Sequence, residues 1–239
     1  MLAVAFDSAG SAAVLPFIRP ARVEPAKLEQ RAWDRELTIG VAAPQYPCVI
    51  DERHVVAEAY GMVNVPTVVW IDEDGHMVRA PEPPGASDGF RSMNLQTGAV
   101  PPEVTEDTRL RRRIYFDAVQ DWIDRGSASR HVLPPDEVRR RLRGYEPKDS
   151  LAAAHFRLGV WLARKGEAAA AQRALDEAVS LRPESWTIRR QKIVLADPAL
   201  TAQLAATPEF WQAVHALGDG LYYAATDIDG MPPPRPRSG

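Results

Sequence analysis

The chain has 239 residues, of which 45% are hydrophobic and 26% are charged, and its net charge is −3 at pH 7. This balance is that of a globular protein, and it excludes a strong general attraction to nucleic acid. The single cysteine, Cys48, excludes an intramolecular disulfide, a CxxC motif and a multi-thiolate metal site. Because no apolar run is long enough to cross a bilayer and no signal peptide is visible, we expect a cytoplasmic protein without a membrane partner.

Strand and helix patterns alternate at the start of the chain. Residues 2–6 (LAVAF) and 46–50 (YPCVI) are short apolar runs, which predict strands buried on both faces, as in a parallel sheet. Residues 12–18 predict a helix that ends before Pro20. A second short helix is predicted over residues 24–37 from weaker spacing.

A helix and a hairpin follow. Residues 52–60 predict a helix that begins after a capping aspartate, Asp51, and stops at Gly61. Residues 67–71 (TVVWI) are β-branched and aromatic, and the turn sequence DEDG leads into a returning strand at residues 76–79. Together with the first elements, this order predicts a mixed sheet.

The sequence pattern of the second half of the chain predicts mainly helices. Residues 80–105 are rich in proline and lack periodicity, which predicts a long loop. Residues 106–124 have the spacing of an amphipathic helix, and residues 136–142 predict a shorter one after two prolines. Residues 150–217 are helical in pattern, and residues 231–239 (MPPPRPRSG) predict an extended, disordered tail.

The segment AYGMVNVPTVVWIDEDGHMV, residues 59–78, together with the strands and helices before it, resembles the thioredoxin-like proteins of the bacterial ResA/TlpA type. The resemblance covers about residues 1–80, with residues 106–124 as the closing helix. It implies a cis bond between Val65 and Pro66, and a loop whose backbone at these two residues binds the extended chain of a substrate. The other interpretation of Pro66 is a simple turn at the sheet edge.

The family's reactive dithiol has no counterpart in this chain. The resemblance places WCxxC after a strand that would precede residues 2–6, where the chain has no residues. Cys48 lies within an apolar strand pattern, so we expect it to be buried and unreactive. We therefore expect no dithiol exchange, no catalytic residue, no cofactor and no metal. Since the missing strand would be a central one, we also expect that Met1 is not the natural start.

A second resemblance, to the tetratricopeptide repeat, covers residues 155–183 within a predicted repeat unit at 150–184. It rests on a helix–turn–helix spacing carried by Leu158, Gly159, Leu162, Gly166, Ala171, Leu175, Ala178 and Pro183. A single repeat cannot bury its own face, so we expect the predicted helices at 187–195 and 208–217 to cover it. The repeat either holds a peptide or only packs within the protein.

Other chemical signals are weaker. The basic runs RLRRR and RRRLR are flanked by acidic residues, which indicates solvated helix faces rather than nucleic-acid binding. The sequence DEDG lacks the ligand offsets of a calcium loop. No two histidines have the sequence spacing of paired metal ligands. The histidines are His54, His76, His131, His155 and His215.

The sequence thus predicts an α/β thioredoxin-like domain over residues 1–125, a helical region over 126–230 and a disordered tail over 231–239. The resemblance implies an oxidoreductase family member that is inactive as written, whose partners are protein thiols or disulfides, a peptide, or a second copy of the chain. The alternative is a non-catalytic interaction module that uses the helical region. A peroxiredoxin-like enzyme with a lone thiol is a third reading, but it needs an exposed, acidic cysteine.

Overall fold

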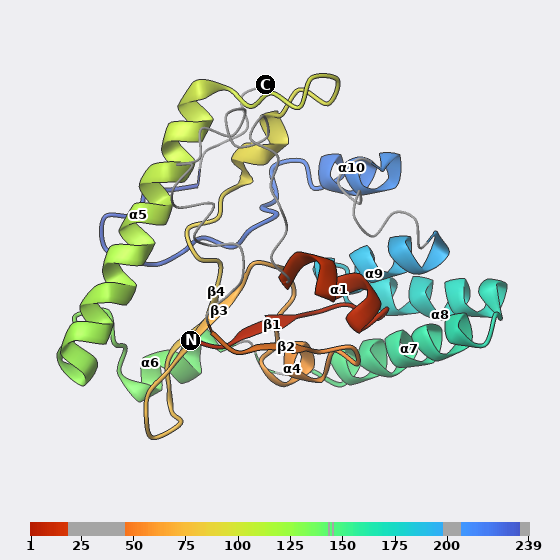
Figure 1. Ribbon diagram of the computed structural model, residues 1–239, viewed down its shortest axis with the longest axis horizontal. Coiled ribbons are helices and arrows are strands. Elements are labelled where there is room, and N and C mark those ends of the chain that lie inside the picture. The colour runs from red at the N-terminus through yellow and green to blue at the C-terminus, as the bar shows by residue number, and fades with distance from the viewer. Residues whose placement is uncertain (19–45, 143, 145, 198–206, 235–239) are drawn as a thin grey trace. The chain divides into compact units, whose positions relative to one another are not determined.

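The computed structural model describes residues 1–18, 46–142, 144, 146–197 and 207–234 (Figure 1). The predicted helix at 24–37 lies outside these residues. Contacts divide the chain into two compact units, Met1–Ala59 and Tyr60–Gly239. The boundary predicted after residue 125 falls inside the second unit, because Val132 and Ile228 pack in the same core as the hairpin and the helix before residue 125.

The first unit is a small α/β arrangement. Strand β1 (Ala3–Ala5) pairs in parallel with β2 (Cys48–Ile50). Helix α1 (Ser11–Ile18) follows β1 in the chain, and α4 (Val55–Ala59) is the last element of the unit. The strands and α1 are where the sequence predicts them.

The expectation that these strands are buried on both faces is wrong. Every residue of β1 is only half-buried, and Val49 at the centre of β2 keeps 43% of its surface exposed. The physical reason is local: each strand has one ladder partner among the described residues, so its side chains lack the neighbours that a central parallel strand has.

The second unit opens with an antiparallel hairpin, β3 (Val68–Ile71) and β4 (Met77–Glu82). Asp72 shapes its turn by accepting hydrogen bonds from the backbone N–H groups of Asp74 and His76. The hairpin confirms the prediction, although β4 runs further than expected into the proline-rich region. Among the described residues, β1–β2 and β3–β4 are separate two-stranded ladders rather than one mixed sheet.

Helix α5 (Pro102–Arg125) covers the hairpin. Trp70 of β3 is 1% exposed and donates from Nε1 to the hydroxyl of Tyr115 at 2.8 Å. The same indole stacks on Trp122 with ring centroids 5.0 Å apart. Val78 and Ile228 complete this core, so a residue near the C-terminus belongs to the hairpin's packing.

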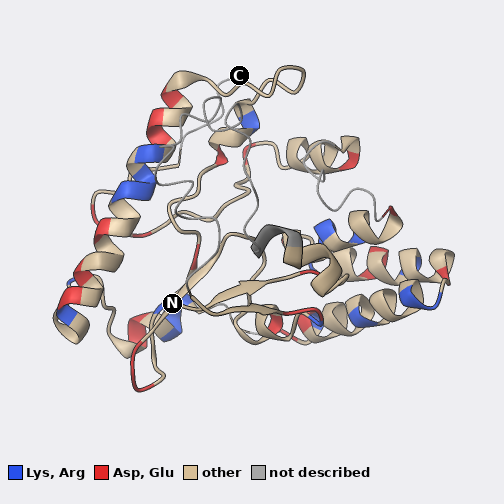
Figure 2. Cartoon of the chain, viewed as in Figure 1, with Lys and Arg blue, Asp and Glu red and all other residues tan. Residues whose placement is uncertain are grey.

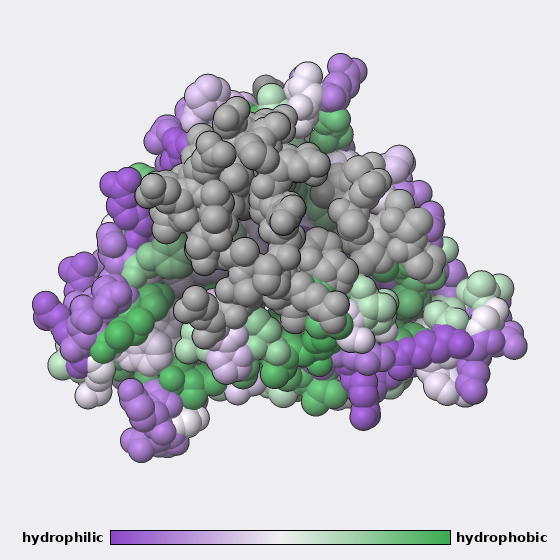
Figure 3. Space-filling model, viewed as in Figure 1, coloured by the Kyte–Doolittle hydropathy of each residue, from purple (hydrophilic) through white to green (hydrophobic). Residues whose placement is uncertain are grey.

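Short elements join the parts of the second unit. They are the 3-10 helices η1 (Asp88–Ser92) and η2 (Gly126–Ala128) and helix α6 (Pro135–Arg141). Helix α5 carries both acidic and basic residues along its length, and the edge of the molecule where it lies is largely hydrophilic in the space-filling view, although Phe116 and Ile123 are exposed (Figures 2 and 3). In the first basic run Arg109 pairs with Glu106 at the exposed surface, but Arg111 is 4% exposed and pairs with Asp107, so the expected solvated face holds for only part of the run.

The helical region contains α7 (Pro147–Arg164), α8 (Ala168–Leu181), α9 (Trp186–Ala196) and α10 (Pro208–His215). Helices α7 and α8 form an antiparallel hairpin (Figure 1). A Cβ at Gly159 would lie 2.6 Å from Cγ of Leu175, so only glycine allows this approach. Leu175 itself is 0% exposed. The helical hairpin predicted from this spacing is therefore present.

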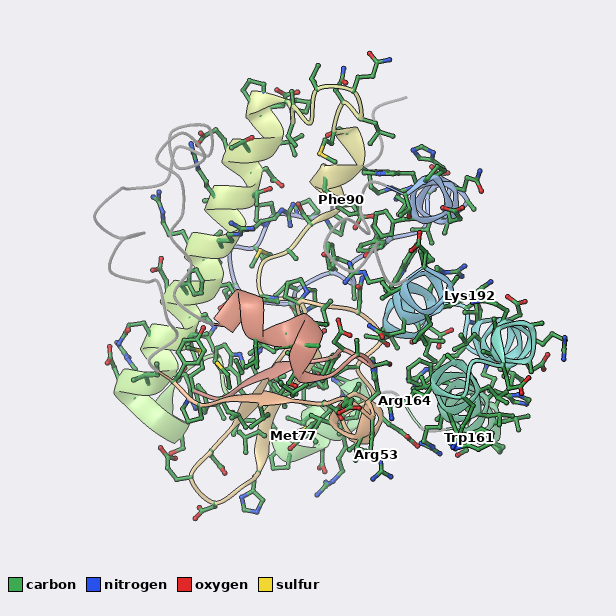
Figure 4. All side chains as sticks on the ribbon, turned by 45° about the vertical axis from the view of Figure 1, so that its right-hand side comes forward. Arg53, Met77, Phe90, Trp161, Arg164 and Lys192 are labelled. Atoms are coloured by element: carbon green, nitrogen blue, oxygen red, sulfur yellow. The ribbon has the colours of Figure 1, made fainter. Side chains whose placement is uncertain are left out.

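The third helix of the region continues the packing. Ile188 of α9 joins Phe156, Val160 and Leu175 in one apolar cluster, and Lys192 pairs with Asp176 of α8 (Lys192 is labelled in Figure 4). Helix α9 thus covers one side of the hairpin, as expected, whereas α10 packs in a separate cluster with Trp186 of α9. None of the helices within the described ranges is long and apolar enough to span a membrane.

Candidate functional site

The site residues predicted from the resemblance lie in a short segment that precedes β3. We call residues 63–66 the proline loop. Gly61 adopts a positive φ of 62° and ends the helix before it, and the Val65–Pro66 bond is cis, as the resemblance implied. Pro66 is exposed, Val65 is half-buried, and Asn64 is 7% exposed. The loop therefore presents its proline outward while Asn64 points into the protein.

Asn64 organises the loop. Its side-chain carbonyl accepts a hydrogen bond from the backbone N–H of Val65 at 2.9 Å. Its backbone carbonyl accepts from the hydroxyl of Thr67 at 2.6 Å. Its side-chain amide donates to the backbone carbonyl of Tyr222 at 2.9 Å. A single buried side chain thus connects the loop to a segment 158 residues away.

Two further hydrogen bonds to the loop come from residues elsewhere in the chain. The N–H of Thr187, in the first turn of α9, donates to the carbonyl of Val63 at 3.1 Å. The hydroxyl of Tyr223 donates to the carbonyl of Val65 at 3.2 Å. Both backbone polar groups of Val65, the residue expected to bind an extended substrate chain, are thus engaged inside the protein.

Cys48, which carries the only thiol of the chain, lies in the first unit. Cys48 is the first residue of β2, and its side chain is half-buried rather than fully buried as expected. Its Sγ lies 3.5 Å from the carbonyl of Tyr46. Since it is the only cysteine in the chain, no second thiol exists to resolve a mixed disulfide.

The first unit also contains a buried histidine that the sequence did not single out. His54 is 6% exposed and has a positive φ of 56°. Burial lowers the pKa of His54 to about 4, against an opposing effect of the Asp51 carboxylate. That carboxylate caps α4 by accepting from the backbone N–H groups of Val55, Val56 and Ala57. The predicted cap is confirmed, although the helix begins three residues later than expected.

We expect acid to weaken the fold through His54. Its pKa is about 4 when folded and about 6.5 when unfolded, so the unfolded chain binds more protons between these values. The neutral, buried imidazole contributes its full stability above pH 6.5, and this stability is lost as the pH falls toward 4. The loss amounts to about 2 kcal/mol at pH 5. Urea unfolding at pH 7.5 and 5.0 should show this loss, and His54→Asn, which tolerates the same φ, should remove it. Equal pH dependence in both proteins would contradict it.

A group of possible metal ligands lies at the hairpin turn. Carboxylate and imidazole atoms of Asp72, Asp74 and His76 lie within 4.8 Å of one another. Asp72 Oδ1 already accepts two backbone N–H groups, and Asp74 and His76 are exposed. The arrangement is accounted for by the turn.

A polar pocket of about 470 Å³ lies along α5. It is lined by Ile114, Asp117, Ala118, Asp121, Arg125, Arg130, His131 and Asp229. Burial lowers the pKa of His131, and the nearby Arg130 lowers it further. The hydroxyl of Ser129 donates to Asp121 at 2.7 Å, and this bond lowers the pKa of Asp121. Within the lining itself, Arg125 pairs with Asp121 and Nε of Arg130 donates to Nε2 of His131.

Helix α7 presents apolar side chains to solvent. Leu151, Leu158 and Trp161 keep 48%, 46% and 55% of their surface exposed. With Ala154 between them, their spacing places them on one face of the helix, which we call the α7 stripe. Lys165 lies over the Trp161 ring, with its Nζ 5.8 Å from the centroid (Trp161 is labelled in Figure 4).

Sequence reasoning missed the C-terminal segment as a partner of the loop. Residues 221–230 lack a periodic pattern, yet Tyr222 is 4% exposed and Ile228 is 5% exposed. The one available signal was the pair of consecutive tyrosines in a region otherwise read as irregular. Residues 231–234 are also held, since Arg111 donates to the carbonyls of Pro232 and Pro233 at 2.8 and 2.7 Å.

Comparison with known proteins adds no relative. No family model, no curated protein and no solved structure matches the chain.

Proposed function

We propose that this chain is a thioredoxin-like protein that binds extended polypeptide at the proline loop and carries out no dithiol exchange itself. The observation that carries the proposal is the chain order around the loop. Strand, helix, strand and helix precede Gly61, and the loop then leads into an antiparallel hairpin that α5 covers. In the thioredoxin-like proteins that the sequence resembles, the loop at this place binds the extended chain of a substrate by strand addition.

The chemistry of the chain supports binding without redox turnover. Thiol–disulfide exchange proceeds through a mixed disulfide, and release of the product needs a second thiol close to the first. The chain offers one thiol, Cys48, in strand β2. A bound chain would therefore be held by backbone hydrogen bonds and apolar contact rather than by a covalent intermediate.

Binding of an unfolded polypeptide tests this function. The probe is fluorescein-labelled insulin B chain whose cysteines are carboxymethylated, so that it is extended and has no thiol. We expect saturable binding in fluorescence anisotropy, with the same affinity for the wild-type protein and for Cys48→Ser. We also expect no catalysed reduction of intact insulin. Turnover that disappears in Cys48→Ser would contradict the proposal.

A second candidate function uses the α7 stripe. Repeat hairpins stack helix on helix, and α9 supplies a neighbour on one side of the α7–α8 hairpin. On the other side Leu158 and Trp161 remain exposed, which suits the apolar face of an amphipathic helix from a partner.

A double variant separates this function from the first. Leu158→Ser with Trp161→Ser should reduce binding of a synthetic leucine–glutamate amphipathic helix at least tenfold, because both anchors are lost. The unfolding free energy should change little, since both side chains are largely exposed. Leu95→Ser is the matched control, because Leu95 is 52% exposed and lies outside α7. Equal binding by all three proteins would exclude the stripe as the binding surface.

A further inference from the structure

The bonds around the proline loop point to an occupant within the chain. Strand addition requires the backbone N–H and C=O of the receiving residue to face the incoming chain. At Val65 the N–H is bound by Asn64 Oδ1 at 2.9 Å, and the C=O is bound by the Tyr223 hydroxyl at 3.2 Å. An incoming polypeptide therefore meets a loop whose hydrogen-bonding groups are already in use.

Tyr223, which donates to the carbonyl of Val65, and its neighbour Tyr222 are themselves fixed through their backbone. Both carboxylate oxygens of Asp88 accept backbone N–H groups, from Tyr222 at 2.8 Å and from Tyr223 at 2.9 Å. Arg91 binds Asp88 Oδ2 at 3.1 Å and also donates to the carbonyls of Gly218 and Gly220, each at 2.8 Å. The side chains of Asp88 and Arg91 are 14% and 8% exposed. This arrangement sets the position of Tyr223 before any partner arrives.

The two tyrosines differ in how firmly they are held. The ring of Tyr222 is 4% exposed within an aromatic cluster that includes Phe90, Trp186 and Phe210 (Phe90 is labelled in Figure 4). Tyr223 is only half-buried, and Ala224 and Ala225 after it are exposed. The Tyr223 hydroxyl can thus leave the loop while Tyr222 stays in the core.

The phenol is suited to this contact at neutral pH. Burial raises the pKa of Tyr223 above its ordinary value, against the opposing effect of Arg190. The hydroxyl therefore remains protonated and serves as a donor to the carbonyl of Val65.

We infer that Tyr222 and Tyr223 act as an internal occupant of the proline loop, which a bound polypeptide displaces at the Tyr223 hydroxyl. This inference rests on the proposed function, because it assigns the regulation of the same loop. It makes Tyr223 a residue that lowers the affinity of the loop for an incoming chain. Its removal should therefore strengthen binding, whereas loss of an ordinary structural contact would weaken binding or leave it unchanged.

The test compares Tyr223→Phe with the wild-type full chain, using the labelled, carboxymethylated insulin B chain. Removing one hydroxyl-to-carbonyl bond should tighten binding about fivefold. The matched control is Tyr60→Phe, which removes a half-buried tyrosine hydroxyl outside the proline loop and should bind like the wild type. Circular dichroism melting of all three proteins establishes that each is folded.

Each outcome is decisive. Tighter binding by Tyr223→Phe alone supports the internal occupant, including the case in which only this variant binds measurably. Wild-type binding with equal or weaker binding by Tyr223→Phe overturns the inference and leaves the proposed function standing. Absence of binding by all three folded proteins overturns both.

Discussion

Replacing Leu175 with alanine should lower the free energy of unfolding by about 3–5 kcal/mol. Leu175 is 0% exposed and fills the space between α7 and α8, where Gly159 lets the two helices approach. The truncation removes apolar burial and leaves a cavity, because the helices on both sides are held by their own neighbours. Urea unfolding followed by circular dichroism measures the loss.

The same substitution at an exposed position controls for helix propensity. Leu158→Ala changes the same side chain on the neighbouring helix, where Leu158 keeps 46% of its surface exposed. We expect a loss of less than about 1 kcal/mol. Similar losses for Leu158→Ala and Leu175→Ala would show that the hairpin is not packed around Leu175.

Replacing Arg79 with methionine should cost a similar amount, about 3–5 kcal/mol, through charge rather than cavity formation. Arg79 is 2% exposed on β4 and binds the carboxylate of Glu82 through Nε at 2.8 Å and Nη2 at 3.1 Å. Nη1 also donates to the carbonyl of His131 at 2.9 Å. Without the guanidinium, Glu82 would remain as a largely buried anion beside Tyr115, whose pKa burial already raises.

A double-mutant cycle isolates that cost. Glu82→Gln removes the negative charge, so Arg79→Met with Glu82→Gln should be less destabilised than the sum of the two single variants. The measurement is urea unfolding of the four proteins at pH 7. Additive losses would show that the two side chains do not depend on each other for charge neutralisation.

Local patterns predicted most of the elements. The turn sequence DEDG between β-branched residues indicated the β3–β4 hairpin, and the spacing of Gly159, Ala171 and Leu175 indicated the α7–α8 hairpin. These features depend on neighbours within about twenty residues, so hydrophobic periodicity and turn chemistry are sufficient to find them.

Long-range contacts could not be predicted in this way. Arg79 looks like a solvent-facing residue at the end of a strand, but it is buried by residues 131 and 227, which lie far along the chain. The occupancy of the proline loop by Tyr223 likewise depends on a segment without periodic pattern. The expectation of buried strands at β1 and β2 failed for the same reason, because burial depends on neighbours that local sequence does not specify.

The location of bound polypeptide tests the central claim most directly. Carboxymethylated insulin B chain can be titrated into isotope-labelled protein while backbone amide signals are followed by NMR. Binding at the proline loop predicts that the largest shifts fall on Val63, Asn64, Val65 and Thr67, with accompanying shifts at Tyr222 and Tyr223. Shifts confined to α7, or saturating binding that leaves the loop signals unmoved, would contradict it.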